Sequence, residues 1–295
     1  MALLIASIGF GLAAGAVIAL GAVGFTVQFG ISNVLNIMYG SLMTLAAYLG
    51  LFLIDRRANV WVVMAIVGIA IAVSSAAFRR LIVAPLQRRG TRGFGIIIVT
   101  VSAAIVLQYT IVAIVGPQAQ SYGPQGGATL HFAGMTLSAA QVAIIGTAAL
   151  LMLGLHLLLT RTKLGRAMRA TSANPTLAQS CGIETEVISD VAWLISGALC
   201  GAAGVALAIT TVSFDFTLGS IFLIPMIAAA VLGGVGQPQG AMLGGLVVGV
   251  ASEVAGAFWD PAYKDVIAFV ILVAMLLIRP RGLFGASWST GRLVG

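Results

Sequence analysis

Charged residues are scarce in this chain: Asp, Glu, Lys and Arg together make up 8% of its 295 residues. Soluble domains carry roughly 25% charged residues. Hydrophobic residues account for 60% of the sequence, so water could not solvate the surface that such a chain would present. The composition therefore excludes a soluble globular protein and places the chain in a lipid bilayer.

Cysteine and histidine are also rare, with two of each. Cys181 and Cys200 form no CxxC pair and no disulfide framework, and His131 and His156 are too isolated to indicate a metal site. The sequence has no GxSxG elbow, no HExxH motif and no intramembrane aspartate motif of the GxGD type. We therefore expect no metal and no catalytic site, and interpret the chain as not an enzyme.

Lysine occurs at two positions alone, Lys163 and Lys264. A phosphate-binding P-loop needs Gly-Lys-Ser or Gly-Lys-Thr, but these lysines follow Thr162 and Tyr263. The chain therefore has no ATP site of this kind and is expected to hold no cofactor. If ATP drives its activity, another subunit must hydrolyse the nucleotide.

The sequence is rich in long apolar runs. A helix needs about 20 apolar residues to cross the hydrocarbon core of a membrane. Nine candidate spans lie near residues 4–27, 34–54, 60–78, 94–115, 139–160, 190–212, 220–236, 239–257 and 264–279. The first run precedes every cationic residue, so we interpret it as a retained span and not as a cleaved signal peptide. The expected fold is an all-α integral membrane protein with about nine (eight to ten) transmembrane helices, the second and seventh being partial or re-entrant candidates.

Basic residues predict which ends of the spans face the cytoplasm, because cytoplasmic loops are enriched in Lys and Arg. The segment 116–138 contains neither residue. Three other segments are basic, and their cations are Arg79, Arg80, Arg88, Arg89 and Arg92; Arg161, Lys163, Arg166 and Arg169; and Arg279, Arg281 and Arg292. This pattern predicts an N-terminus outside and a C-terminus in the cytoplasm, with Arg56 and Arg57 as exceptions on the outer side. It also accounts for the net charge of +7 without a nucleic-acid partner.

The order of the spans predicts two halves of opposite orientation. Four spans, within about 4–115, precede the linking span 139–160, and four more, within about 190–279, follow it. Residues 1–285 would then form a single membrane domain, followed by a cytoplasmic tail at 286–295. Inverted repeats of this kind place the substrate route at their interface, beside interrupted helices.

Each half contains a polar approach to a Gly-Ser pair, Gly40-Ser41 in one and Gly219-Ser220 in the other. Polar groups inside a membrane are costly and mark pathways by default, although many only bond to a neighbouring helix. Aligning the two pairs also aligns Asn36 with Asp215. The candidate pathway residues are Asn33, Asn36, Tyr39, Ser41 and Asp215. The alternatives are helix bonding or capping for the asparagines, an interfacial anchor for Tyr39 and a solvated loop charge for Asp215.

Two further features of the second half have structural interpretations. Glu253 lies late in an apolar span, and we expect it to pair with Lys264 or Arg56 near the outer face. The spacing of Gly244, Gly245 and Gly249 is typical of close helix packing in membranes.

The stretch "TRTKLGRAMRATSANPTLAQSCGIETEV", residues 160–187, is too polar to cross a membrane. Within the predicted cytoplasmic loop 161–188, Asn174 and Pro175 indicate a cap and the start of a helix. A small apolar face would follow, made of Leu177, Ala178, Cys181 and Ile183. Such a helix could dock into a groove on a partner, or it could be an interfacial helix held by its own arginines.

Several stretches in the same order resemble one known family. They are "ALGAVGFTVQFGISNVLNIMYGSLMTLAAY", "FRRLIVAPLQ", "GRAMRATSANPTLAQSCGI", "AAVLGGVGQPQGAMLGGLVVGV" and "AYKDVIAFVILVAMLLIRPRGLFG". Together they cover roughly residues 8–285 and resemble the LivH-type permease subunits of branched-chain amino acid ABC importers.

The resemblance implies a type II importer-like fold in a bacterial inner membrane, in contact with lipid. It also implies a second, LivM-like permease, two ATP-binding cassette subunits that bind ATP and Mg, and a periplasmic or extracellular solute-binding protein. Residues 161–188 would be the coupling loop that docks on the ATPase subunits. The coupling surface carried over from the family comprises Arg166, Arg169, Asn174, Ala178, Gly182 and Ile183.

The sequence departs from the family pattern at two places. Members commonly read Asn-x-Ala-His-Gly after the first span, whereas this chain has Met38 and Tyr39 at the Ala and His positions, which bears on the solute. In the coupling loop, Ala173 stands where an acidic residue often precedes Asn-Pro, which bears only on a contact with the ATPase. The expected solute is a branched-chain or other hydrophobic amino acid. Urea, short amides and small carboxylates, including aromatic ones, are alternatives, as is a stand-alone secondary transporter or channel.

Overall fold

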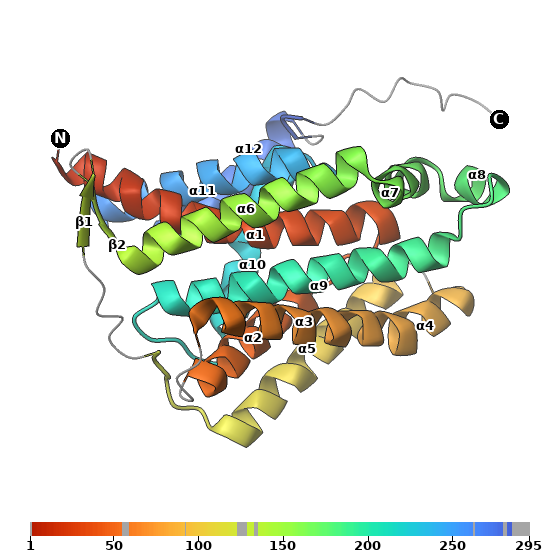
Figure 1. The fold of residues 1–295 in the computed structure, drawn as a ribbon, viewed down its shortest axis with the longest axis horizontal. Coiled ribbons are helices and arrows are strands. Elements are labelled where there is room, and N and C mark those ends of the chain that lie inside the picture. The colour runs from red at the N-terminus through yellow and green to blue at the C-terminus, as the bar shows by residue number, and fades with distance from the viewer. Residues whose placement is uncertain are drawn as a thin grey trace.

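The computed structural model describes residues 2–54, 59–91, 93–122, 129–132, 135–261, 263–279 and 282–284 (Figure 1). This part of the chain is helical apart from one short hairpin. Its helices are α1 (Ala2–Ser32), α2 (Met38–Ile54), α3 (Val60–Phe78), a π-helical turn η1 (Arg79–Val83), α4 (Ala84–Arg88), α5 (Phe94–Val115), α6 (Ala139–Arg161), α7 (Lys163–Ala173), α8 (Pro175–Ser180), α9 (Thr185–Thr210), α10 (Leu218–Gly233), α11 (Pro238–Phe258) and α12 (Tyr263–Ile278). The hairpin pairs β1 (Thr129–Phe132) with β2 (Met135–Ser138) in antiparallel register.

Six helical runs in the described residues are long and apolar enough to cross a membrane. They are Ala6–Ser32, Val60–Arg88, Phe94–Val115, Ala139–Arg161, Thr185–Thr210 and Pro238–Phe258. The helices Met38–Ile54 and Leu218–Gly233 are apolar but shorter, in agreement with the partial character predicted for the second and seventh spans. The membrane-protein class is thereby confirmed, and the total of nine spans stays a prediction.

The third predicted span, 60–78, coincides with α3, and η1 and α4 continue the helical run to Arg88. The second predicted span begins too early, for an identifiable reason. The sequence 34–54 is not one helix: Asn33 adopts a left-handed conformation (φ 50°) that ends α1, and α2 begins only at Met38. Asparagine tolerates this conformation at helix ends better than most residues.

Small residues bring the central helices into close contact. A Cβ atom added at Gly11 would lie 2.8 Å from the Cα of Val250, and one at Gly15 would lie 3.1 Å from that of Leu246. Gly245 and Gly249 of α11 face α1 in the same way, against Ala19 and Gly15. The glycine spacing of the sequence thus serves helix packing, as predicted.

The helix contacts of the two halves correspond to each other. Helix α1 packs along α11, and α9 packs along α3, while α1 and α9 contact each other between them. Likewise α2 contacts α5 as α10 contacts α12, and the two short helices α2 and α10 meet. Every contact in the first half therefore has a counterpart in the second half under the order-preserving match α1, α2, α3, α5 to α9, α10, α11, α12.

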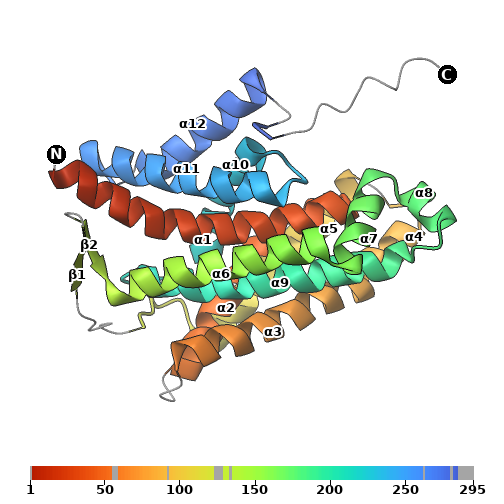
Figure 2. The ribbon, with the colours of Figure 1, turned by 45° about the horizontal axis from the view of Figure 1, so that its top comes forward.

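The predicted loops gather at two opposite ends of the bundle. Figures 1 and 2 show α4, α7 and α8 at one end, and the N-terminus and the β1–β2 hairpin at the other. The first two basic segments thus share one end, and the segment 116–138, where described, lies at the opposite end. We name these the α7–α8 end and the hairpin end. Arg56 and Arg57, the exceptions to the charge pattern, lie outside the described residues.

Candidate functional site

A polar cluster lies buried where the chain passes from α1 to α2. The Oε1 atom of Gln28 accepts hydrogen bonds from Ser196 Oγ at 3.1 Å and from Asn36 Nδ2 at 3.4 Å. Asn36 is fully buried. Its Oδ1, the Nε2 of Gln28 and the Oγ1 of Thr26 are buried without a hydrogen-bond partner among the described residues. Gln28 of α1 therefore connects Ser196 of α9 with Asn36 in the segment before α2, and Asn36 keeps an unused acceptor inside the bundle.

Tyr39 is a core residue in this arrangement. Its side chain is 1% exposed, and its hydroxyl donates a hydrogen bond to the carbonyl oxygen of Gly21 at 3.1 Å. Its ring packs edge-on against Phe25, with centroids 5.9 Å apart. The thiol of Cys200 donates to the Tyr39 carbonyl at 3.4 Å. The interfacial-anchor alternative is therefore wrong, because helices α1 and α9 enclose the ring.

Asn33 and Ser41 lie in different surroundings. Asn33 is exposed at the end of α1, where its backbone N–H donates to the Phe29 carbonyl at 2.8 Å. The hydroxyl of Ser41 is buried and donates to the Ala104 carbonyl of α5 at 3.1 Å. The structure thus brings Asn36, Tyr39 and Ser41 into the bundle and leaves Asn33 at its surface. The pathway role of all four stays a prediction.

The two Gly-Ser pairs predicted to correspond meet in space. A Cβ atom at Gly40 would lie 2.6 Å from the carbonyl oxygen of Gly219, and one at Gly219 would overlap the Gly40 carbonyl. The Gly219 N–H donates to Thr44 Oγ1 at 3.0 Å. The backbones of α2 and α10 therefore touch directly, which only glycine permits at these two positions.

Asp215 lies just before α10, at the hairpin end, and its side chain bonds to the N-cap residue of that helix, Thr217. Its Oδ1 accepts hydrogen bonds from the N–H and hydroxyl of Thr217, at 2.8 and 2.5 Å. It also lines a cavity of about 360 Å³. The preceding residue, Phe214, forms an antiparallel bridge with Gln120 and contacts the ring of Tyr122 edge-on. The carboxylate thus lies half-buried beside a cavity, which is neither a span interior nor an open loop.

Tyr122 connects the segment around Phe214 with α2. Its hydroxyl donates to the Ala47 carbonyl at 2.6 Å. Burial raises the pKa of Tyr122 above its ordinary value, so the phenol stays protonated and remains a donor. No sequence pattern singled out this residue, because its partners come from α2 and from the segment after α9.

Helices α7 and α8 form a corner at the α7–α8 end. The side chain of Asn174 accepts from the Leu177 N–H at 3.1 Å and so caps α8, with Pro175 in its first turn, as predicted. The C-terminus of α8 is a Schellman motif: Ile183 N–H donates to the Ala178 carbonyl at 3.0 Å and Gly182 N–H to the Gln179 carbonyl at 2.9 Å. Gly182 has a φ of +82°. The spacing of Ala178 and Gly182 therefore has a structural reason.

The side chains of this corner point in different directions. Ala178 is buried, Ile183 is half-buried, and both face the bundle. Leu177 is 62% exposed and Cys181 is exposed, so the predicted single apolar face of α8 is wrong. Leu177 is the apolar group of α8 that a partner would contact, although it is absent from the candidate coupling surface. In the sequence, the outward direction of Leu177 was indicated by its position three residues after the capping Asn174.

Arg166 and Arg169 are both exposed on α7. The guanidinium of Arg169 donates to the carbonyl of Leu159 on α6. Arg169 and Ser172 also line a cavity of about 450 Å³, the inner cavity, together with Thr26 of α1 and the residues 236–239 before and at the start of α11. Helix α7 is therefore both a surface element and a wall of an internal space.

Ion pairs fasten the first basic segment to α9. The Arg79 guanidinium pairs with Asp190, and Arg80 Nε lies 3.2 Å from the same carboxylate. Arg88 Nη2 lies 2.9 Å from Glu186 Oε2. Arg79 is buried, whereas the Arg88–Glu186 pair is exposed. These acids adjoin the end of the predicted coupling loop, and no sequence pattern predicted their pairing.

Residues 7–276 match the profile of a family described as the permease component of branched-chain amino acid transport systems. The chain belongs to this family. It is 30% identical to BraD of Pseudomonas aeruginosa, a high-affinity branched-chain amino acid transport system permease, over 93% of this chain and 94% of that one. It is 28% identical to LivH of Escherichia coli K12, which carries the same description, over 93% of each chain.

The permease also shows partial similarity to a protein named for another solute. It is 32% identical to LsrC of Escherichia coli O9:H4, an autoinducer 2 import system permease, over 42% of this chain and 38% of that one. No solved structure matches the permease. The family establishes a multi-pass membrane protein that is a component of a transport system with other subunits. The resemblance derived from the sequence motifs is thereby confirmed.

Proposed function

We propose that this permease is the transmembrane subunit of an ATP-driven importer and that its solute is a branched-chain or other hydrophobic amino acid. The observation that carries the proposal is similarity over nearly the whole chain to BraD and LivH, both described as branched-chain amino acid permeases. A second, LivM-like permease would complete the pathway. A solute-binding protein would deliver the solute from the hairpin end, which the positive-inside rule places outside.

Two partner ATPase subunits would supply the energy at the opposite end. They would bind the ATP and Mg, and the corner formed by α7 and α8 would dock on them. Arg166 and Leu177 are its exposed contacts, and the Schellman motif at Gly182 makes the corner rigid. Rigid elements transmit movement as bodies, and α7 contacts α1, α6 and α9. Movement of the ATPases would therefore reach the bundle and the inner cavity directly.

The corresponding helix contacts of the two halves support an inverted repeat. The match of α1, α2, α3 and α5 to α9, α10, α11 and α12 pairs the α2–α3 and α2–α5 contacts with the α10–α11 and α10–α12 contacts, and α2 meets α10 at Gly40 and Gly219. Inverted repeats place the route at the repeat interface. Under this proposal the two short helices, α2 and α10, lie at the interface of the two repeats, beside the solute route.

Co-purification and transport test the proposal. The affinity-tagged chain, extracted from its host membranes, should bring down a second permease and two ATPase subunits. Proteoliposomes of the complex should take up leucine only with ATP and a loaded binding protein. Uptake by the isolated chain without ATP would instead support a secondary transporter. Uptake of urea, short amides or carboxylates in place of leucine would support an ATP-driven importer with a different solute.

A further inference from the structure

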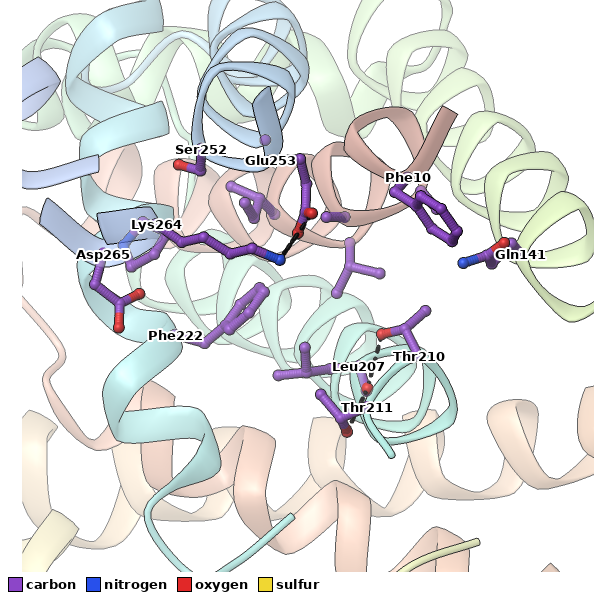
Figure 3. Close-up of a pocket in the computed structure, with 16 residues that line it drawn as sticks. Phe10, Gln141, Leu207, Thr210, Thr211, Phe222, Ser252, Glu253, Lys264 and Asp265 are labelled. Atoms are coloured by element: carbon purple, nitrogen blue, oxygen red, sulfur yellow. Dashed lines mark hydrogen bonds and ion pairs between the residues drawn. The ribbon is translucent and has the colours of Figure 1, made fainter. Parts of the chain in front are cut away.

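A cavity of about 340 Å³ lies at the hairpin end, between α1, α6, α9, α10, α11 and α12. We name it the outer cavity. Figure 3 shows Glu253 and Lys264 reaching toward each other within it, with Asp265 on one side and Phe10 and Gln141 on the other. Its volume is at the small end of the roughly 300–1,000 Å³ found for ligand pockets. The space therefore suits a solute of amino-acid size.

The ion pair is an unusual lining for a cavity inside an apolar bundle. Lys264 Nζ lies 2.8 Å from both carboxylate oxygens of Glu253. Glu253 lies on α11 five residues before its end at Phe258, or about 7–8 Å along the helix. The side chains are 21% and 38% exposed, so neither is buried completely. Ionisable groups at such depth are costly and are a functional hypothesis by default.

Further carboxylates make this end of the cavity system negative. Asp265 lines the outer cavity and also the neighbouring cavity beside Asp215. The two cavities share Thr211 and Phe222 as well. Two carboxylates, Glu253 and Asp265, thus share the outer cavity with one ammonium group, and a third, Asp215, lines the neighbouring cavity. An amine is attracted to such a space, whereas a solute with only a carboxylate is repelled.

Apolar groups complete the lining opposite the charges. Phe10 comes from α1, Leu207 from α9 and Phe222 from α10. Figure 3 shows Leu207 and Phe222 on the α9–α10 side of the ion pair. The outer cavity therefore offers an acceptor for an ammonium, a donor for a carboxylate and an apolar surface within one small space.

We propose that the outer cavity is a binding site for a zwitterionic α-amino acid with an apolar side chain. The solute opens the Glu253–Lys264 pair: its ammonium binds the carboxylates of Glu253 and Asp265, and its carboxylate binds Lys264. Each half of the pair thereby exchanges one charged partner for another, so neither charge is left unpaired. The apolar side chain packs against Phe10, Leu207 and Phe222. This assignment rests on the proposed amino-acid import and locates a site for it.

Binding to the full chain tests the assignment. The chain is placed in phosphatidylglycerol nanodiscs, which contain no ammonium lipid, and L-leucine is titrated by saturation-transfer difference NMR. Leucinamide lacks the carboxylate and is expected to bind roughly 10-fold more weakly, because one charged hydrogen-bonding partner is lost. The acid analogue 4-methylpentanoate is expected not to bind. Equal binding of this acid and of leucine would overturn the assignment.

Variants separate a binding site from a structural clamp. Glu253→Gln is expected to weaken leucine binding roughly 10- to 100-fold. The exchange of both residues, Glu253→Lys with Lys264→Glu, restores the ion pair and should restore the melting temperature but not leucine binding. Recovery of binding by the exchanged pair would show that only the clamp matters. Glu186→Gln, which breaks the exposed ion pair at the other end, should leave binding unchanged.

Two further measurements distinguish an amino-acid site from a lipid site, and the site from the transport function. A phosphatidylethanolamine headgroup also carries an ammonium and an anion, so displacement of leucine by this lipid would assign the cavity to lipid and overturn the proposal. ATP-driven leucine uptake by the assembled transporter is measured separately. Uptake with an unchanged KM in Glu253→Gln overturns the cavity assignment and leaves the proposed function standing. A complex that imports no amino acid overturns the proposed function itself.

Discussion

The contact between α2 and α10 can be tested by adding a single methyl group. In Gly40→Ala the new Cβ would lie 2.6 Å from the Gly219 carbonyl oxygen, 0.8 Å short of the 3.4 Å at which ordinary contact begins. The obstacle is backbone, so no side chain can rotate away, and the two helices must separate. Overpacking costs about 1–3 kcal/mol, against about 0.5–1 kcal/mol gained when Ala replaces Gly in a helix. We expect a net loss of about 1–2 kcal/mol.

The assay is thermal unfolding of the purified chain in nanodiscs, followed by tryptophan fluorescence. A loss of this size lowers the melting temperature by several degrees, at roughly 2–4 °C per kcal/mol. Gly146→Ala is the matched control, because a Cβ there meets nothing within 4 Å on α6. The control should be as stable as the wild type or slightly more stable. Equal melting temperatures for the two variants would refute the direct contact of α2 with α10.

Three further predictions concern single side chains. Asp190→Asn leaves the buried Arg79 without its counter-charge and should lower the free energy of unfolding by about 3–5 kcal/mol. Glu186→Gln should leave the melting temperature nearly unchanged, because its ion pair is exposed. Equal losses in the two variants would contradict the difference in burial. Gly182→Ala meets no obstacle but forces a left-handed alanine, so it should cost about 1–2 kcal/mol locally and lower ATP-coupled uptake while the chain stays folded. Tyr39→Phe should lower the free energy of unfolding by about 1 kcal/mol and leave the KM for leucine unchanged, because the lost hydrogen bond lies within the core. A changed KM would instead support a role for Tyr39 in the solute pathway.

The helices themselves could be predicted from the sequence because each is a local pattern. The apolar run 94–115 coincides with α5, and the run 139–160 differs from α6 by one residue. Asn174 and Pro175 likewise announce the start of α8, since capping depends on residues two or three positions apart. Length and polarity of neighbouring residues are sufficient information for features of this kind.

The surroundings of the polar residues could not be predicted in the same way. The sequence shows that Tyr39 and Ser41 lie in an apolar stretch, but their partners are carbonyls of Gly21 and Ala104, on other helices. Composition does not distinguish a hydroxyl that faces a solute from one that faces a distant backbone. The helical run likewise continues past α3 to Arg88, and Arg79 and Arg88 pair with acids about 100 positions later, which are partners that no local pattern shows. The outer cavity likewise depends on the packing of six helices.

The positions of the outer and inner cavities along α1 indicate which movement transport would require. Residues 10–18 of α1 line the outer cavity and residues 26–31 line the inner cavity. Between them α1 is fully packed, with Leu20 and Val23 buried, Met226 against Gly21 and Tyr39 against Gly24. This layer consists of the buried side chains of Met226 and Tyr39 packed against glycines of α1, which leaves them no space to rotate into, so the layer opens only if a helix shifts. A helix that shifts needs a rigid element to push it. Under the proposed function, α7 would apply that force when the ATPase subunits move, because it contacts α1 and lines the inner cavity.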